Sequence, residues 1–355
     1  MSLPTSSESI PLNPADTRMF AEAHEASSAV ERQLIANEEI MSDLGRRLRA
    51  RPPRFIVTGA RGSSDHAATF GKYVFETRLG LLTASASPSV TSVYAAPQDL
   101  TGALFLAISQ SGRSPDLVRQ AKAARHAGAH VIALVNTPDS PLAAVADETI
   151  FLHAGPELSV AATKSYICSL SAIIHLAAAW GGDAVLLGAL ESLPGALRAA
   201  WPLEWTPMVD GFTDARNLFV IGRGLGLGIA QEAALKFKET CGLHAEAFSA
   251  AEVRHGPMAI VDRGFPVLFF VQNDETREGT LEVAEEFRAR GARVFVAAAA
   301  GTPGPDLLPT GPSVHPVCAP LVAIQNFYRA VNALALRRGR NPDNPPHLNK
   351  VTETL

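Results

Sequence analysis

The 355-residue chain is too long for one typical domain, and its 47% hydrophobic content can supply the cores of two. Its net charge of −4 gives no bias toward nucleic acid or membrane surfaces. Its three cysteines, Cys168, Cys241 and Cys318, lack C-x-x-C spacing, which argues against a disulfide framework or a structural zinc site. Because no secretory signal and no apolar run of membrane length is visible, we expect a soluble, cytoplasmic protein.

The first fifty residues form a segment of their own. Residues 1–14 have the composition of a disordered start, and apolar residues then recur at helical spacing from Asp16 to Ala50. This pattern predicts a helical segment that is interrupted once near Ser27-Ser28 and ended by Pro52-Pro53.

The rest of the chain contains an internal duplication. Residues 55–76 combine a short apolar run, a Gly/Ser turn and a helical pattern, and the same arrangement returns 163 positions later (218 − 55) at residues 218–239. Residues 104–135 and 267–298 repeat with the same offset. One offset over both pairs predicts two subdomains of similar topology.

Strands that alternate with helical segments predict an α/β fold for each copy. We expect a parallel sheet flanked by helices, in a flavodoxin- or Rossmann-like three-layer sandwich. A Pro/Gly-rich loop over 299–316 and a helix over 321–338 complete the second copy. The expected parts are an N-terminal segment (1–50), a first subdomain (51–190), a proline-containing link (191–217), a second subdomain (218–340) and a C-terminal tail (341–355).

The two copies differ in the loop after their second strand. The first copy has Ser109-Gln110-Ser111-Gly112-Arg113-Ser114, whereas the second has Gln272-Asn273-Asp274-Glu275. Hydroxyl and N–H groups at the start of a helix bind anions, and carboxylates repel them. Gly62-Ser63-Ser64 offers a second such turn, and parallel sheets bind ligands at the carboxyl ends of their strands. We therefore predict a phosphate site in the first copy; ordinary helix capping by serine is the alternative.

The segment from Glu232 to Pro257 carries acids, lysines and histidines on an apolar helical background. Such groups at helical spacing fit proton-transfer chemistry. The alternative is an amphipathic helix with solvated i,i+4 pairs such as Glu232 and Lys236. In the duplication, Glu76 of the first copy matches Glu239 of this segment.

Four motifs resemble those of the SIS (sugar isomerase) domain family. They are most similar to the isomerase portion of glucosamine-6-phosphate synthase and to stand-alone sugar-phosphate deaminases of that type. The closing PPHLNKVTETL is also similar, and the resemblance covers residues 30–355. The motifs are GSS (62–64), SQSGRSPD (109–116), GPELSVAATKSY (155–166) and EAALKFKETCGLHAEAFSAAEVRHGP (232–257).

The resemblance implies a role for each site residue. Glu239 would move a proton between C1 and C2 of the sugar, with Lys236 beside it to tune its charge. His255, contributed by the neighbouring subunit of a homodimer, would open the sugar ring, and Lys350 would lie near the carbonyl carbon. Gly62, Ser63, Ser64, Ser109, Gln110, Ser111 and Ser114 would bind the phosphate and hydroxyls of a hexose 6-phosphate, and Val160, Ala162 and Thr163 would line the sugar.

This chemistry requires an acid, a base and a cation, and we expect no metal, no redox cofactor, no nucleic acid and no membrane. The sequence also departs from the family. Arg113 replaces a Glu and Ala162 replaces a Ser, which leaves the substrate open. No Cys precedes Cys168, so we do not expect the family's glutaminase route to supply nitrogen.

We therefore predict an enzyme that converts glucosamine 6-phosphate and water to fructose 6-phosphate and ammonia. One alternative is an aldose–ketose isomerase or deglycase that acts on another hexose 6-phosphate. Another is a non-catalytic module that senses phosphosugars. The joint presence of Glu239, His255 and Lys350 favours catalysis, because binding needs only the serine loops.

Overall fold

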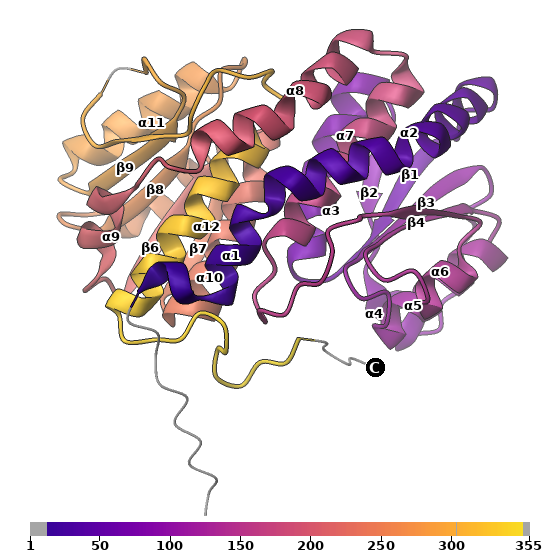
Figure 1. The fold of residues 1–355 in the computed structure, drawn as a ribbon, viewed down its shortest axis with the longest axis horizontal. Coiled ribbons are helices and arrows are strands. Elements are labelled where there is room, and N and C mark those ends of the chain that lie inside the picture. The colour runs from indigo at the N-terminus through magenta and orange to yellow at the C-terminus, as the bar shows by residue number, and fades with distance from the viewer. Residues whose placement is uncertain (1–12, 303, 351–355) are drawn as a thin grey trace, which may run out of the picture.

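The computed structural model describes residues 13–302 and 304–350. Two five-stranded parallel sheets lie on opposite sides of the molecule, with helices between them (Figure 1). The strand orders are β2-β1-β3-β4-β5 and β7-β6-β8-β9-β10, so the two sheets have the same topology. The predicted pair of tandem α/β subdomains is therefore confirmed.

The first subdomain alternates strands and helices as the sequence predicts. Its strands are β1 (Phe55–Gly59), β2 (Thr83–Ser85), β3 (Ala103–Ser109), β4 (His130–Val135) and β5 (Glu148–Phe151). Its helices are α3 (Ser63–Leu79), α4 (Pro88–Ser92), α5 (Pro115–His126), α6 (Pro141–Val145) and α7 (Lys164–Gly181).

The second subdomain repeats this pattern. Its strands are β6 (Asn217–Gly222), β7 (His244–Ser249), β8 (Pro266–Phe270), β9 (Arg293–Ala298) and β10 (Leu307–Pro309). Its helices are α10 (Leu225–Cys241), α11 (Arg277–Ala289) and α12 (Ala319–Arg337), with the 3-10 turns η2 (Glu252–His255) and η3 (Pro257–Ile260) after β7. The short strand β10 lies within the segment predicted to be a loop.

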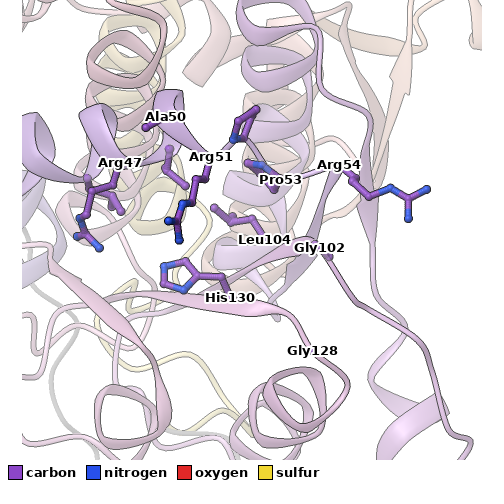
Figure 2. A pocket seen from close by; sticks show the side chains of 13 residues that line it. Arg47, Ala50, Arg51, Pro53, Arg54, Gly102, Leu104, Gly128 and His130 are labelled. Atoms are coloured by element: carbon purple, nitrogen blue, oxygen red, sulfur yellow. The ribbon is translucent and has the colours of Figure 1, made fainter.

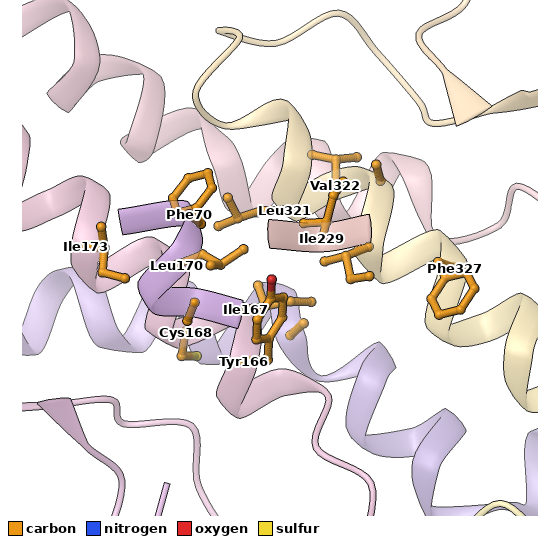
Figure 3. Packing of buried hydrophobic residues seen from close by; sticks show 14 of the residues in the cluster. Phe70, Tyr166, Ile167, Cys168, Leu170, Ile173, Ile229, Leu321, Val322 and Phe327 are labelled. Carbon is orange, nitrogen blue, oxygen red and sulfur yellow. The ribbon is translucent and has the colours of Figure 1, made fainter. Parts of the chain in front are cut away.

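The central strands are mostly apolar because each sheet is covered on both faces. In β3, Leu104 and Leu106 join one hydrophobic cluster, whereas Phe105 and Ala107 join another beneath α5 and α6. The first of these clusters also includes side chains from one face of the second sheet, so the two subdomains share a single inner core. Figure 3 shows part of this core, where side chains from both subdomains, including Phe70, Leu170, Ile229 and Leu321, pack together.

Helices α3 and α10 cross closely inside this shared core. A Cβ atom at Gly228 would lie 2.8 Å from the carbonyl oxygen of His66 and 3.0 Å from Cβ of Phe70, so only glycine permits this approach. The hydroxyl of Tyr166 donates to the Gly228 carbonyl from α7 (3.1 Å). The crossing brings the first turns of α3 next to the middle of α10.

The segments outside the duplication are mainly helical. The N-terminal segment forms η1 (Pro14–Asp16), α1 (Arg18–His24) and α2 (Ala26–Ala50), and its break falls at Glu25, slightly before the predicted Ser27-Ser28. The link contains the end of α8 (Ala184–Ala200) and α9 (Thr206–Phe212), both of which contribute to the shared core. The predicted disordered start falls largely outside the described residues. Within the described part of the chain, no helix is long and apolar enough to span a membrane.

The predicted offset of 163 residues between the two copies holds for the strands but is wrong by one residue for helices α3 and α10. The strand registers follow the predicted offset, since Ile56 pairs with Leu104 and Phe219 pairs with Val267. The helices do not, because the turn before α10 is one residue shorter than the turn before α3. The caps are Gly62 and Gly80 for α3 and Gly224 and Gly242 for α10, with the same left-handed φ at each pair and an offset of 162 (224 − 62).

The corrected alignment changes the partners of the charged residues. Glu76 corresponds to Lys238 and not to Glu239. The counterparts of Glu232, Lys236 and Glu239 in α3 are Phe70, Val74 and Thr77.

Candidate active site

A pocket of about 430 Å³ lies at the carboxyl ends of β1 and β3, against α10 and the C-terminal tail. Most of the predicted site residues line it, and Thr163 and His255 do not. The lining consists of Arg61, Gly62, Ser63, Ser64, Ile108, Ser109, Gln110, Ser111, Ser114, Leu117, Val160, Ala162, Lys236, Glu239, Leu348, Asn349 and Lys350.

One wall is formed by the two serine loops of the first subdomain. Gly112 has φ +62°, and a Cβ atom there would lie 2.4 Å from Oγ of Ser140, so the turn before α5 requires glycine. Ser109 Oγ accepts a hydrogen bond from the Gly112 N–H at 3.0 Å, which fixes this turn. Ser114 precedes α5 without a side-chain capping bond, and so its hydroxyl is available to a ligand. Neutral donors at a helix start suit a phosphate group.

The adjoining wall is α10, where three ionisable side chains meet. Lys236 Nζ lies 2.6 Å from Glu239 Oε2 and 3.3 Å from Glu232 Oε1, and it donates to Ser63 Oγ at 3.1 Å. Lys236 and Glu232 are fully buried, whereas 19% of the Glu239 side chain is exposed. Of the two carboxylates, only Glu239 reaches the pocket.

The interpretation of Glu232 and Lys236 as a solvated surface pair is therefore wrong. Glu232 is held by three side chains from two other helices: Ser63 Oγ at 3.1 Å and His66 Nδ1 at 3.0 Å from α3, and the Tyr328 hydroxyl at 3.1 Å from α12. The sequence missed its role because burial depends on the crossing of α3 and α10. Its position one turn before Lys236 was the available signal.

Both members of this buried pair stay charged. Burial alone would raise the pKa of Glu232, but the Lys236 ammonium and the hydrogen bond from His66 outweigh it and lower the pKa below its usual value. Burial alone would lower the pKa of Lys236, yet Glu232 and Glu239 together raise it well above the usual range. The site thus holds a permanent ammonium beside Glu239, whose carboxylate faces the pocket.

The C-terminal tail closes the site through Lys350. Its Nζ donates to Glu157 Oε2 at 3.1 Å and to the Ser159 carbonyl at 2.7 Å. Burial would raise the pKa of Glu157, but Lys350 and a hydrogen bond from the Ser165 hydroxyl outweigh it and lower the pKa. Glu157 also accepts the Thr163 N–H at 3.0 Å. Thr163 is buried, and its hydroxyl also donates to Glu157. It therefore supports the loop that carries Val160 and Ala162 but does not line the pocket itself.

His255 does not reach the pocket of its own chain. It is exposed at the end of η2, beyond β7. Its assignment to a neighbouring subunit's site remains a prediction. Sequence reasoning also missed Arg61, which lies directly before Gly62 and lines the pocket.

A second cavity, of about 640 Å³, is larger but carries different chemistry. Figure 2 shows it at the end of α2, near the start of β3 and β4, with Arg47, Arg51 and His130 around an apolar floor that includes Leu104. None of its described lining residues carries a carboxylate, so they offer no general base of the kind that Glu239 provides. The smaller pocket is therefore the better candidate. Among the described residues, no cluster of His, Cys, Asp and Glu side chains could hold a metal ion.

Comparison with known proteins agrees with this geometry. The sequence profile of the SIS domain matches residues 51–179 and 211–301. Glutamine–fructose-6-phosphate aminotransferases (isomerizing) from Methanothermobacter thermautotrophicus and Thermus thermophilus are 35% and 32% identical to the chain; each alignment covers 94% of this chain and 57% and 58% of the relative. The chain thus spans a little over half the length of these relatives.

Several solved structures are also similar to this chain over most of its length. A Silicibacter pomeroyi protein to which phosphosugar isomerase activity is attributed is 45% identical, with a TM-score of 0.87 over 92% of this chain and 100% of the other. The C-terminal domain of a glucosamine-fructose-6-phosphate aminotransferase from Francisella tularensis is 25% identical, with a TM-score of 0.83 over 93% and 98% of the two chains. A glucosamine-6-phosphate deaminase from Thermotoga maritima shares the fold, at 20% identity and a TM-score of 0.79 over 95% of this chain and 100% of the other.

Proposed function

The chain belongs to the SIS domain family, and we propose that it catalyses the conversion of glucosamine 6-phosphate and water to fructose 6-phosphate and ammonia. The family match and the Silicibacter neighbour support a phosphosugar isomerase type of activity. The observation that carries the proposal is the Lys236–Glu239 pair, at 2.6 Å, in the pocket that the serine loops also line.

The phosphate is bound by neutral donors of the first subdomain, which leaves the other end of the open sugar chain toward α10. The Glu239 carboxylate takes the proton from C2 and returns it to C1, while the oxygen on C1 gains a proton and the amino nitrogen on C2 loses one. The result is a hydroxyl group at C1 and an imine at C2. Water then adds to the imine carbon and ammonia leaves, so atoms and charge balance. The Lys236 ammonium stabilises the negative charge that develops during the proton transfer.

Two further residues complete the proposal. Lys350, which Glu157 and Ser159 hold at the pocket, lies close to the reacting carbonyl carbon and polarises its oxygen. His255 opens the pyranose ring from a neighbouring subunit of a homodimer, since its own chain leaves it exposed and outside the pocket. Ring opening needs a group that can both give and take a proton near neutral pH, which histidine can do.

The direct test is to incubate the purified protein with glucosamine 6-phosphate and to measure fructose 6-phosphate and ammonia. We expect both products in equal amounts. Fructose 6-phosphate without ammonia from any aldose 6-phosphate, or release of an amine from a fructosamine 6-phosphate, would replace the proposal by the isomerase or deglycase alternative. Binding of these sugars without turnover would replace it by the sensing module, in which Glu239 has no chemical task.

A further inference from the structure

We infer that Arg61 binds the phosphate group of the substrate and makes the site select a phosphorylated sugar over a neutral one. The inference rests on the proposed function, because it assigns a further residue to the same pocket. Arg61 lies between the end of β1 and Gly62, lines the pocket and has half of its side chain (51%) exposed.

A buried carboxylate holds the guanidinium group in place. Arg61 Nε and Nη2 donate to Asp116 Oδ2 at 2.9 and 2.7 Å. Asp116 is fully buried in the first turn of α5, and its Oδ1 accepts the Leu117 N–H at 2.8 Å. Because α5 begins where the loop from Ser109 to Ser114 ends, this contact fixes the guanidinium beside the predicted phosphate loop.

Arg61 is the most accessible cation of the pocket. Lys236 is fully buried between two carboxylates, and Lys350, whose side chain is 25% exposed, donates to Glu157 and Ser159. Arg61 Nη1 has no hydrogen-bond partner among the described residues. Arg113 of the second serine loop does not line the pocket, so the lining residues of these loops supply only neutral donors. Arg61 therefore adds a charge-assisted hydrogen bond, which binds a phosphate dianion more strongly than a neutral donor does.

The contact with Asp116 holds the Arg61 guanidinium in place before a ligand binds. An arginine that is free in solvent loses side-chain entropy when it binds a ligand, whereas one that is already held by a buried acid has lost most of it. The held guanidinium still offers N–H groups in a planar fork that matches phosphate oxygens. Lysine at this position would keep the charge but could not bridge Asp116 and a phosphate with the same geometry.

Binding can be measured by calorimetry with inorganic phosphate, glucosamine 6-phosphate and unphosphorylated glucosamine. We expect Arg61→Ala to weaken binding of both phosphate-containing ligands by about tenfold or more, and Arg61→Lys to recover only part of the loss. Affinity for glucosamine should stay within about twofold. Arg119→Ala removes an exposed positive charge from α5 outside the pocket and should leave all three affinities unchanged.

The outcomes separate this inference from the proposed function. Wild-type affinity for phosphate in Arg61→Ala would overturn the inference, even if the enzyme releases ammonia. An equal loss for phosphate-containing and neutral ligands would also overturn it, because Arg61 would then act only by bridging the two loops. If Arg61→Ala loses phosphate affinity selectively and the wild type releases no ammonia, the inference holds and the proposed reaction fails.

Discussion

Helices α3 and α10 occupy the same place in the two subdomains, yet they place opposite kinds of side chain there. Where α3 has the buried apolar Phe70 and Val74, α10 has the fully buried Glu232 and Lys236. Since α3 folds with apolar residues at these positions, the architecture does not require charges. A buried ion pair contributes little stability compared with well-packed apolar residues, so its presence in α10 points to chemistry.

The loops after β3 and β8 show the reverse contrast, because here the first subdomain carries the groups suited to a ligand. After β3, the first subdomain has hydroxyl groups that can meet an anion, whereas after β8 Asp274 accepts the Thr276 N–H at 2.9 Å and so caps its own turn. In the loop after β3, Ser109 likewise accepts the Gly112 N–H at 3.0 Å, so the two loops differ mainly in the negative charge that Asp274 and Glu275 would present to an anion. Each subdomain therefore lacks what the other supplies, and the candidate site exists only where α3 and α10 cross.

The sharpest test of this contrast replaces the carboxylate that faces the pocket. Glu239→Gln should lower turnover by about 10²–10⁴-fold, because the amide cannot accept the C2 proton. Affinity for the substrate should change little, and steady-state kinetics combined with calorimetry separates the two effects. The matched control is Thr77→Val at the corresponding position of α3, which should leave turnover unchanged. Turnover that survives in Glu239→Gln would contradict the proposed role.

The next test asks what the buried pair does for stability. Lys236→Met leaves Glu232 buried without its counter-ion and should cost about 3–5 kcal/mol in the free energy of unfolding. The double variant Glu232→Gln/Lys236→Met removes both charges, keeps the hydrogen-bonding shape of residue 232 and imitates the uncharged α3. It should regain most of that loss and remain inactive. Urea unfolding measures this, and equal losses in both variants would show that the charges do not depend on each other.

A smaller effect, on the pH dependence of stability, distinguishes α7 of the first subdomain from α12 of the second. Tyr328 of α12 donates to Glu232, whereas His175 Nδ1 of α7 is buried without a hydrogen-bond partner among the described residues. Burial lowers the pKa of His175 to about 4. The unfolded chain therefore binds a proton that the folded chain does not between pH 6.5 and 4, and stability falls as the pH drops through this window.

Replacing His175 should remove this loss. Between pH 7 and pH 5 the wild type should lose about 2 kcal/mol more than His175→Leu in the free energy of unfolding. The exposed His126 offers a control, since His126→Ala should keep the pH dependence of the wild type. Parallel curves for the wild type and His175→Leu would show that the imidazole does not stay neutral in the fold.

Much of this arrangement follows from the sequence alone. Apolar runs at a constant offset indicated two α/β subdomains with parallel sheets, and both sheets have that topology. Glycine and serine at the loop after β3, with acids at its counterpart, located the predicted phosphate loop. These features are local: strand periodicity, turn glycines and the start of a helix are all encoded by residues that are neighbours in the chain.

Only the tertiary structure decided the rest. It showed that α3 and α10 align one residue differently from the strands, because a turn is shortened by one residue, and that Glu232 is buried and not solvated. It also brought Arg61 to Asp116 and Lys350 to Glu157, pairs that are 55 and 193 residues apart in the chain. Burial and charge pairing depend on contacts between distant segments, and for that reason the pattern of a single helix could not distinguish a solvated ion pair from a buried one.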